Sequence, residues 1–123
     1  MLVQDKDFSK VQNKNKGDVG EILAAKFLHK KGFQLVEMNY KNKLGEIDII
    51  AIDKGILVFI EVKSRTTLQF GRPYEAVDLR KQQKIRRIAE LYLVTKHKYY
   101  SDCRFDIIEV LDGEIINHII NAF

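Results

Sequence analysis

Four charged side chains interrupt two stretches that otherwise have the composition of buried β-strands. The stretches, residues 45–53 and 56–65, are rich in Ile, Val and Phe. A buried charge is costly unless it is paired or binds a cation. Carboxylates and a lysine brought together could bind a divalent metal ion and activate a water molecule for hydrolysis. The four residues of this candidate site are Glu46, Asp48, Glu61 and Lys63.

The connection between the two stretches decides whether the carboxylates meet. Residues 53–55, Asp-Lys-Gly, are typical of a tight β-hairpin turn. If the loop is only the last two of these, Asp48 lies opposite Glu61 and Glu46 lies opposite Lys63. A three-residue loop would send Asp48 and Glu61 to opposite faces, unless a β-bulge restored their convergence. Opposed carboxylates repel each other unless a cation or a shared proton lies between them.

The elements before the hairpin supply a further acid and a basic turn. The spacing of apolar residues predicts a helix over residues 17–31, with Gly32 as its stop signal. Glu21 shares a face with small and apolar residues, so it is either an acid favoured by the helix dipole or part of the site. Residues 33–40 alternate as a strand does. Lys43, in the connection that follows, either contacts a phosphate backbone or belongs to a generic polar turn.

A second helix is expected after the hairpin, over residues 74–95, with Pro73 in its first turn. Apolar residues at i, i+3, i+4 and i+7 from Ile85 mark its buried face. Its basic residues form a cationic stripe, which is either a phosphate-binding surface or an ordinary solvated face. The residues expected to contact nucleic acid are Lys43, Arg65, Arg80, Lys81, Lys84 and Arg87.

Two final strands are predicted over residues 104–111 and 114–120, around an Asp-Gly hairpin turn. Asp106 interrupts the first strand and either pairs with Arg104 or reaches the site. Cys103 is expected to be a small buried thiol and not a nucleophile. The three histidines are expected to be surface or packing residues.

Composition limits the class of protein. The 123 residues suit a flexible lead-in over 1–15 and a single domain over 16–123. One cysteine excludes an internal disulfide, and there is no paired Cys/His pattern for zinc. Without a signal-peptide pattern or a membrane-length apolar segment, a cytoplasmic protein with no membrane contact is expected. A net charge of +4 and a pI near 9.1 are compatible with a polyanionic partner.

The charged residues also resemble a known nuclease pattern. Asp48 followed by Glu61-Val62-Lys63 resembles the PD-(D/E)xK signature, and a wider set of motifs resembles the bacterial YraN family of endonuclease-like proteins. These motifs cover nearly the whole chain: Gly17-x-x-Gly20-Glu21-x-x-Ala24, Asn39-Tyr40, Gly45-Glu46-Ile47-Asp48, Phe59-Ile60-Glu61-Val62-Lys63-Ser64-Arg65, Phe70-Gly71-x-Pro73-x-Glu75-Ala76-Val77, Arg104-Phe105-Asp106 and Asn121-Ala122-Phe123.

The resemblance implies a fold and a metal site. The fold is α/β, a restriction-endonuclease-like αβββαβ core with a mixed central sheet flanked by helices, which suits the expected order of elements. Catalysis would fall to Asp48, Glu61, Lys63 and Glu21, with Mg²⁺ or Mn²⁺ held by the three carboxylates. Lys63 would orient or deprotonate a water molecule, or neutralise the phosphate. Glu46 could instead hold that lysine in a salt bridge.

Three classes of function stay open. The first is a metal-dependent deoxyribonuclease, Holliday-junction-resolvase-like, that acts on branched or damaged DNA, where a homodimer would suit the cutting of both strands. The second is a nucleic-acid-binding module with little or no cleavage. The third is a protein-interaction subunit with structural charges. A purely structural role does not explain why three charged residues, Asp48, Glu61 and Lys63, lie within otherwise apolar strands.

Overall fold

The computed structural model describes residues 19–69, 71–96 and 102–123. The expected lead-in over residues 1–15, the first positions of the first expected helix and His97 lie outside these ranges. No helix in the described part of the chain is long and apolar enough to span a bilayer.

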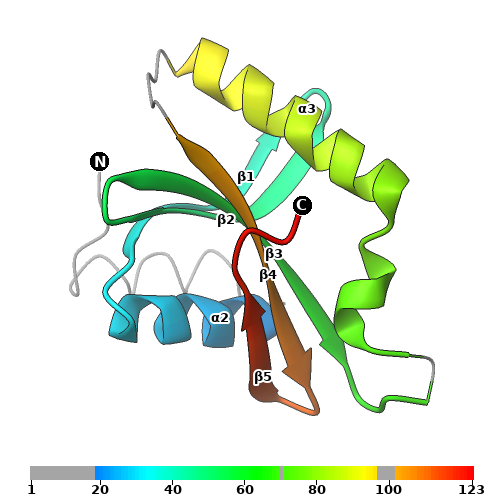
Figure 1. Ribbon diagram of the computed structural model, residues 1–123. Coiled ribbons are helices and arrows are strands. Elements are labelled where there is room, and N and C mark those ends of the chain that lie inside the picture. The colour runs from blue at the N-terminus through cyan, green and yellow to red at the C-terminus, as the bar shows by residue number, and fades with distance from the viewer. Residues whose placement is uncertain (1–18, 70, 97–101) are drawn as a thin grey trace.

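The described residues form a five-stranded mixed sheet with helices beside it (Figure 1). The strands lie in chain order, and all neighbours are antiparallel except β3 and β4, which are parallel. An α/β protein with a mixed sheet and two helices is thus confirmed. The elements are α2 (Val19–Lys30), β1 (Gln34–Asn42), β2 (Gly45–Asp53), β3 (Ile56–Arg65), a 3₁₀ turn η1 (Pro73–Ala76), α3 (Leu79–Thr95), β4 (Cys103–Leu111) and β5 (Glu114–Ile119).

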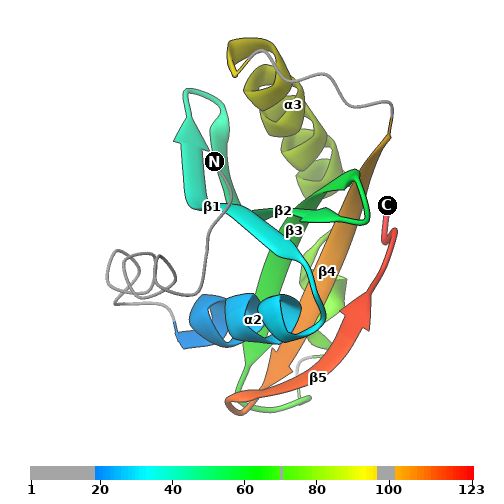
Figure 2. The same cartoon turned by 90° about the vertical axis from the view of Figure 1, so that its left-hand side faces the viewer.

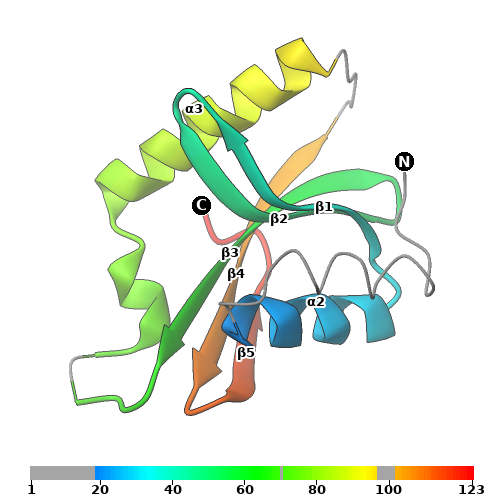
Figure 3. The ribbon, with the colours of Figure 1, turned by 180° about the vertical axis from the view of Figure 1, so that it is seen from behind.

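The two helices cover opposite faces of the sheet (Figures 2 and 3). Alternating residues of β2 and β3 fill a separate core on each side, as expected for strands buried on both faces. Ile49 and Ile60 pack with the buried face of α2, whereas Ile50 and Phe59 pack with α3. The buried residues of α3 are Ile85, Ile88, Ala89 and Tyr92, as the spacing predicted.

The turn between β2 and β3 contains only Lys54 and Gly55, with φ angles of 50° and 84°. Positive φ at both central residues suits the right-handed twist of a two-residue hairpin, and glycine adopts it without steric cost. Asp53 pairs with Ile56, and the register continues as far as Ile49 and Ile60. The two-residue loop considered from the sequence is therefore confirmed.

The expected helix over residues 74–95 is wrong at its start. Pro73 begins only a single 3₁₀ turn, and α3 begins afresh at Leu79. Asp78 lies between them and accepts a hydrogen bond from the Lys81 backbone N–H at 2.9 Å. Aspartate is a strong N-cap residue, so it defines a new helix start. Lys81 consequently lies in the first turn of α3.

The middle of α3 crosses the sheet close to Gly45, the first residue of β2. Gly45 has a φ of 147°, and a Cβ atom there would lie 2.9 Å from Cδ1 of Ile88 and 3.1 Å from Cε of Lys84. A side chain at this position would force the ends of the Ile88 and Lys84 side chains to shift and would be strained by the positive φ. Glycine thus allows α3 to lie against the β1–β2 hairpin.

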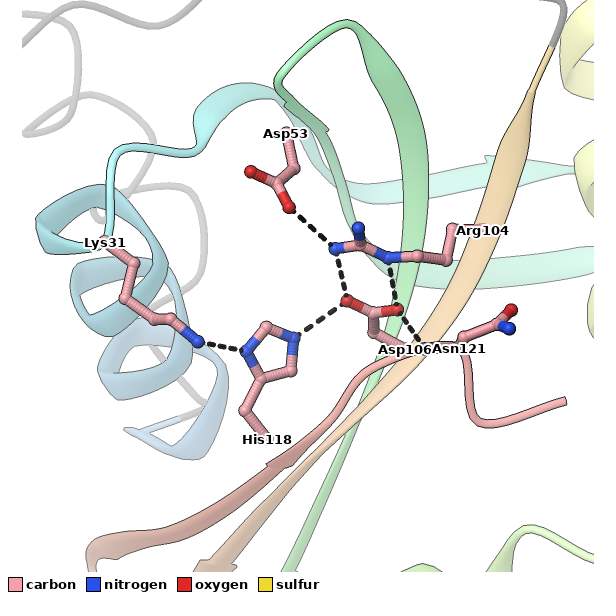
Figure 4. A network of polar contacts seen from close by, with 6 residues as sticks. All are labelled: Lys31, Asp53, Arg104, Asp106, His118 and Asn121. Carbon is pink, nitrogen blue, oxygen red and sulfur yellow. Dashed lines mark hydrogen bonds and ion pairs between the residues drawn. The ribbon is translucent and has the colours of Figure 1, made fainter.

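Asp106 belongs to a buried polar network on the α2 side of the sheet (Figure 4). It accepts hydrogen bonds from Arg104 Nε at 2.9 Å and from the Asn121 N–H at 2.9 Å, and it lies 2.8 Å from Nε2 of His118. Burial alone would raise the pKa of Asp106, but hydrogen bonds from these partners hold it below its ordinary value. Asp106 therefore pairs with Arg104, which settles the alternative that the sequence left open.

Cys103 is exposed, so the expected buried thiol is wrong. It begins β4 at the end of the sheet, and the buried part of that strand starts at Phe105.

Replacing Asp106 with Asn should lower the free energy of unfolding by about 2 kcal/mol at pH 7, because Arg104 and His118 lose a charged hydrogen-bond partner while Arg104 keeps its ion pair with Asp53. Since the folded pKa is lowered, this contribution is present above the ordinary value of 3.8 and is lost as the pH falls through the lower folded value. Urea unfolding at pH 7 and pH 3 measures the change, with Glu114→Gln as an exposed control. A stability difference that is the same at both pH values would contradict this account.

Candidate functional site

Asp48 and Glu61 lie next to each other on β2 and β3, only 9% and 7% exposed. The backbone pairing of these strands ends at Ile49 and Ile60. Beyond that point the Asp48 carboxyl group accepts a hydrogen bond from the Val62 backbone N–H at 2.8 Å. The Asp48 side chain thus accepts the hydrogen bond that a backbone carbonyl of β2 would otherwise accept, at the point where β2 and β3 separate.

The pKa values of the two carboxyl groups are shifted in opposite directions. Burial and, after it, the nearby charge of Glu61 raise the pKa of Asp48 to about 8. Burial opposes ionisation of Glu61 as well, but hydrogen bonds from Asp48 and Lys81 outweigh it and lower its pKa. At neutral pH the pair therefore holds a proton on Asp48 and a negative charge on Glu61.

Two lysines neutralise that charge. Nζ of Lys81 lies 2.9 Å from Oε2 of Glu61, and Nζ of Lys63 lies 3.4 Å from the same oxygen. Burial lowers the pKa of Lys63, and neighbouring Lys81 lowers it further. Burial would also lower the pKa of Lys81, but its hydrogen bonds to Lys63 and Glu61 outweigh burial and raise it.

These groups line one polar pocket of about 370 Å³. Glu21 reaches it from α2 and is itself buried, although α2 packs on the face opposite α3. The predicted convergence of the acids and Lys63 therefore describes the geometry correctly. The lining residues are Glu21, Glu46, Asp48, Glu61, Val62, Lys63, Lys81, Lys84, Ile85 and Ile88.

The pocket has the donor chemistry for a hard divalent cation. Asp48 and Glu61 offer adjacent carboxylate oxygens, which Mg²⁺ and Mn²⁺ prefer, and Mg²⁺ commonly keeps several waters beside one or two carboxylates. Without metal, the proton on Asp48 makes that group neutral, and the ammonium groups of Lys81 and Lys63 neutralise Glu61. Among the described residues, no three Asp, Glu, His or Cys side chains form a metal-binding group. Glu21 as a third ligand stays a prediction.

Glu46 lies apart from the lysine that it was expected to face. Its carboxylate is 3.8 Å from Nζ of Lys41 and 53% exposed, while Lys63 contacts Glu61. The salt bridge considered between Glu46 and Lys63 is therefore wrong, because the strands have already diverged at that position.

The basic residues proposed for nucleic-acid contact fall into separate groups. Lys81 and Lys84 line the carboxylate pocket, whereas Arg80 and Arg87 are exposed elsewhere on α3. Lys43 is exposed in the β1–β2 turn. Arg65 lines a different, mostly apolar cavity of about 450 Å³, together with Val19, Gly20 and others at the start of α2.

Two contacts were missed from the sequence. One is the ion pair between Lys81 and Glu61, which joins α3 to β3. The other is Glu109, fully buried on β4, which binds the Arg72 guanidinium and accepts a hydrogen bond from the Tyr74 N–H at 3.0 Å. Glu109 interrupts an apolar run just as Asp106 does, so the same signal could have identified it.

Comparison with known proteins gives the family of this α/β protein. Residues 20–110 match Uncharacterised protein family UPF0102. A UPF0102 protein of Caldanaerobacter subterraneus is 51% identical over 120 residues, covering 93% of this chain and 98% of the relative. Another, from Dictyoglomus thermophilum, is 48% identical over 118 residues, covering 92% and 100%. The chain belongs to UPF0102, which is the YraN family, so the resemblance is confirmed.

Asp48→Asn should stabilise the metal-free protein at high pH. Because the folded pKa of Asp48 is raised to about 8, its contribution to stability is full below 3.8 and is lost as the pH rises through about 8. The variant avoids this loss and should be more stable at pH 9 by about 1–2 kcal/mol, because the lowered pKa of Glu61 offsets part of the effect.

Urea unfolding of the EDTA-treated proteins between pH 5 and pH 9 measures this difference. Glu46→Gln, which removes a more exposed charge from the same pocket, is the matched control. Parallel stability curves for the wild type and Asp48→Asn would contradict a protonated Asp48.

Proposed function

We propose that this protein is a metal-dependent deoxyribonuclease with a restriction-endonuclease-like fold, which hydrolyses phosphodiester bonds in branched or damaged DNA. The observation that carries the proposal is the meeting of Asp48, Glu61 and Lys63 in one polar pocket where two strands part. The order of helices and strands agrees with an αβββαβ core.

The residues of the pocket would have different roles in phosphodiester hydrolysis. Asp48 and Glu61 would hold Mg²⁺ or Mn²⁺, with release of the Asp48 proton. When bound, such an ion stabilises charge on the scissile phosphate and lowers the pKa of a bound water. Lys63 lies beside Glu61 and can orient the attacking water or neutralise the phosphate.

Basic residues around the pocket would hold the nucleic-acid backbone. Lys84 is exposed at the pocket itself, and Arg80 and Arg87 continue the positive charge along α3. Lys43 lies in the turn of the β1–β2 hairpin, whose strand β2 packs against α3 at Gly45. Contacts from both elements to phosphates would fix the position of the strand without reading its sequence.

A nucleic-acid-binding module without cleavage is the second candidate. It is favoured by the neutralisation of Glu61 by Lys81 and Lys63, which satisfies the buried charge with no metal ion. The two candidate functions use the same nucleic-acid-binding surface, and they differ in whether the bound strand is cleaved.

Purified protein should cleave DNA only when Mg²⁺ or Mn²⁺ is present. A panel of junction, flap, single-stranded and linear substrates, analysed on denaturing gels, measures cleavage. Asp48→Asn and Lys63→Ala should lower the rate by about 10²-fold or more, because each removes a group that contacts the metal or the water. Binding should persist in both variants, and without metal Asp48→Asn should bind as the wild type does at neutral pH, because Asp48 already carries a proton there.

Glu46→Gln is the control for a changed charge in the same pocket, and thermal melts establish that each variant is folded. Wild-type protein that binds these substrates but leaves all of them intact with either metal would support the binding module instead.

The cationic stripe of α3 should determine the salt dependence of binding. Replacing all three of Arg80, Lys84 and Arg87 with Ala should weaken the salt dependence of DNA binding. The slope of the logarithm of the association constant against the logarithm of the salt concentration should fall by about one unit per lost phosphate contact. Affinity should fall by a similar factor for all sequences. Fluorescence anisotropy from 50 to 300 mM salt measures both, with Lys26→Ala on α2 as the control. An unchanged slope would make the stripe an ordinary solvated face.

A further inference from the structure

One carboxylate oxygen of the candidate site already contacts two lysine ammonium groups. Oε2 of Glu61 contacts the ammonium groups of both Lys81 and Lys63, at 2.9 and 3.4 Å. A divalent cation bound by Glu61 would repel both lysines, because like charges interact strongly in a partly buried pocket. At least one ammonium group must therefore move when the site is loaded.

Lys81 is the lysine that can move without disturbing the sheet. Lys63 lies on the same strand as Glu61, and its side chain is 19% exposed. Lys81 reaches Glu61 from α3, and its side chain is 39% exposed. Its flexible four-carbon stem can carry the ammonium group into solvent while the backbone of α3 stays in place.

We propose that Lys81 is a removable counter-ion of Glu61: it neutralises the carboxylate without metal, is displaced when a divalent cation binds, and then contacts the nucleic-acid backbone. This role rests on the proposed function of the site. Because coupling between two ligands is reciprocal, metal binding would strengthen nucleic-acid binding by the factor by which nucleic acid strengthens metal binding. Lys81 would thereby weaken the binding of each ligand until the other is present.

Lys84 provides a matched control. It lies three residues further along α3 and lines the same pocket, yet among the described contacts its ammonium group forms no ion pair with Glu61. Lys84 is thus available to phosphate whether or not a metal ion is bound. Lys84→Met therefore removes a positive charge from the same pocket without removing a contact to Glu61.

The first measurement is Mn²⁺ affinity without nucleic acid, by isothermal titration calorimetry at fixed pH and salt. Lys81→Met should bind Mn²⁺ about fivefold or more tightly than the wild type, because no ammonium group has to be displaced. Lys84→Met should change the affinity by less than about twofold, since its charge is screened by solvent. A merely structural role for Lys81 would weaken Mn²⁺ binding, since the pocket would lose its support.

The second measurement is the affinity for a labelled DNA junction, by anisotropy, with EDTA and with Mn²⁺, with strand integrity checked on gels. Lys81→Met should bind about fivefold more weakly than the wild type with Mn²⁺, and it should lose less affinity than this in EDTA, because Lys81 is then engaged by Glu61. Lys84→Met should be weaker under both conditions. Thermal melts accompany every variant, and Lys81→Gln replaces Lys81→Met if the latter does not fold.

The outcomes separate the two proposals. If Lys81→Met and Lys84→Met bind Mn²⁺ equally well, or if Lys81→Met loses as much junction affinity in EDTA as with Mn²⁺, the counter-ion role is overturned while the metal site stands. If the wild-type protein does not bind Mn²⁺, the proposed metal-dependent function fails, and the counter-ion role fails with it.

Discussion

The two-residue turn of Lys54 and Gly55 is the constraint on which both the fold and the candidate site depend. Side chains alternate between the faces of a strand, so the length of this turn decides which residues of β2 and β3 share a face. With two residues in the turn, Asp48 meets Glu61 and the apolar residues divide between two cores. One additional residue would move the side chains of one strand to the opposite face and separate the carboxyl groups. The same hydrogen-bond register therefore stabilises the protein and assembles its site.

Buried acids on this sheet are neutralised in two different ways. Asp106 and Glu109 are held by Arg104 and Arg72, and a guanidinium group stays protonated and can bind a carboxylate through more than one hydrogen bond. Glu61 is neutralised by lysines and by a neighbouring acid that carries a proton. A proton and an ammonium group on a flexible stem can both leave. The first arrangement is suited to stability, and the second leaves room for a ligand.

Local patterns predicted what local interactions decide. The hairpin register follows from the Lys54–Gly55 turn, and the buried face of α3 follows from helical spacing. The break before α3 was missed because residues 74–95 continue one periodicity, although Asp78 is a recognisable N-cap. The contact between Lys81 and Glu61 depends on where α3 lies over the sheet. That position is a tertiary property, so the sequence could place Lys81 on a basic stripe but not in the pocket.

The position of α3 is set on both sides of Lys81. On one side Glu109 binds the segment that precedes the helix, through the Tyr74 N–H and a neighbouring guanidinium group. On the other side Ile88 packs against Gly45, where no side chain intervenes. A helix held at two points cannot readily shift as a unit, because close-packed contacts on each side resist it. If a cation binds, the response of α3 is therefore confined to its side chains. Of the α3 side chains that line the pocket, Lys81 is the one in contact with Glu61.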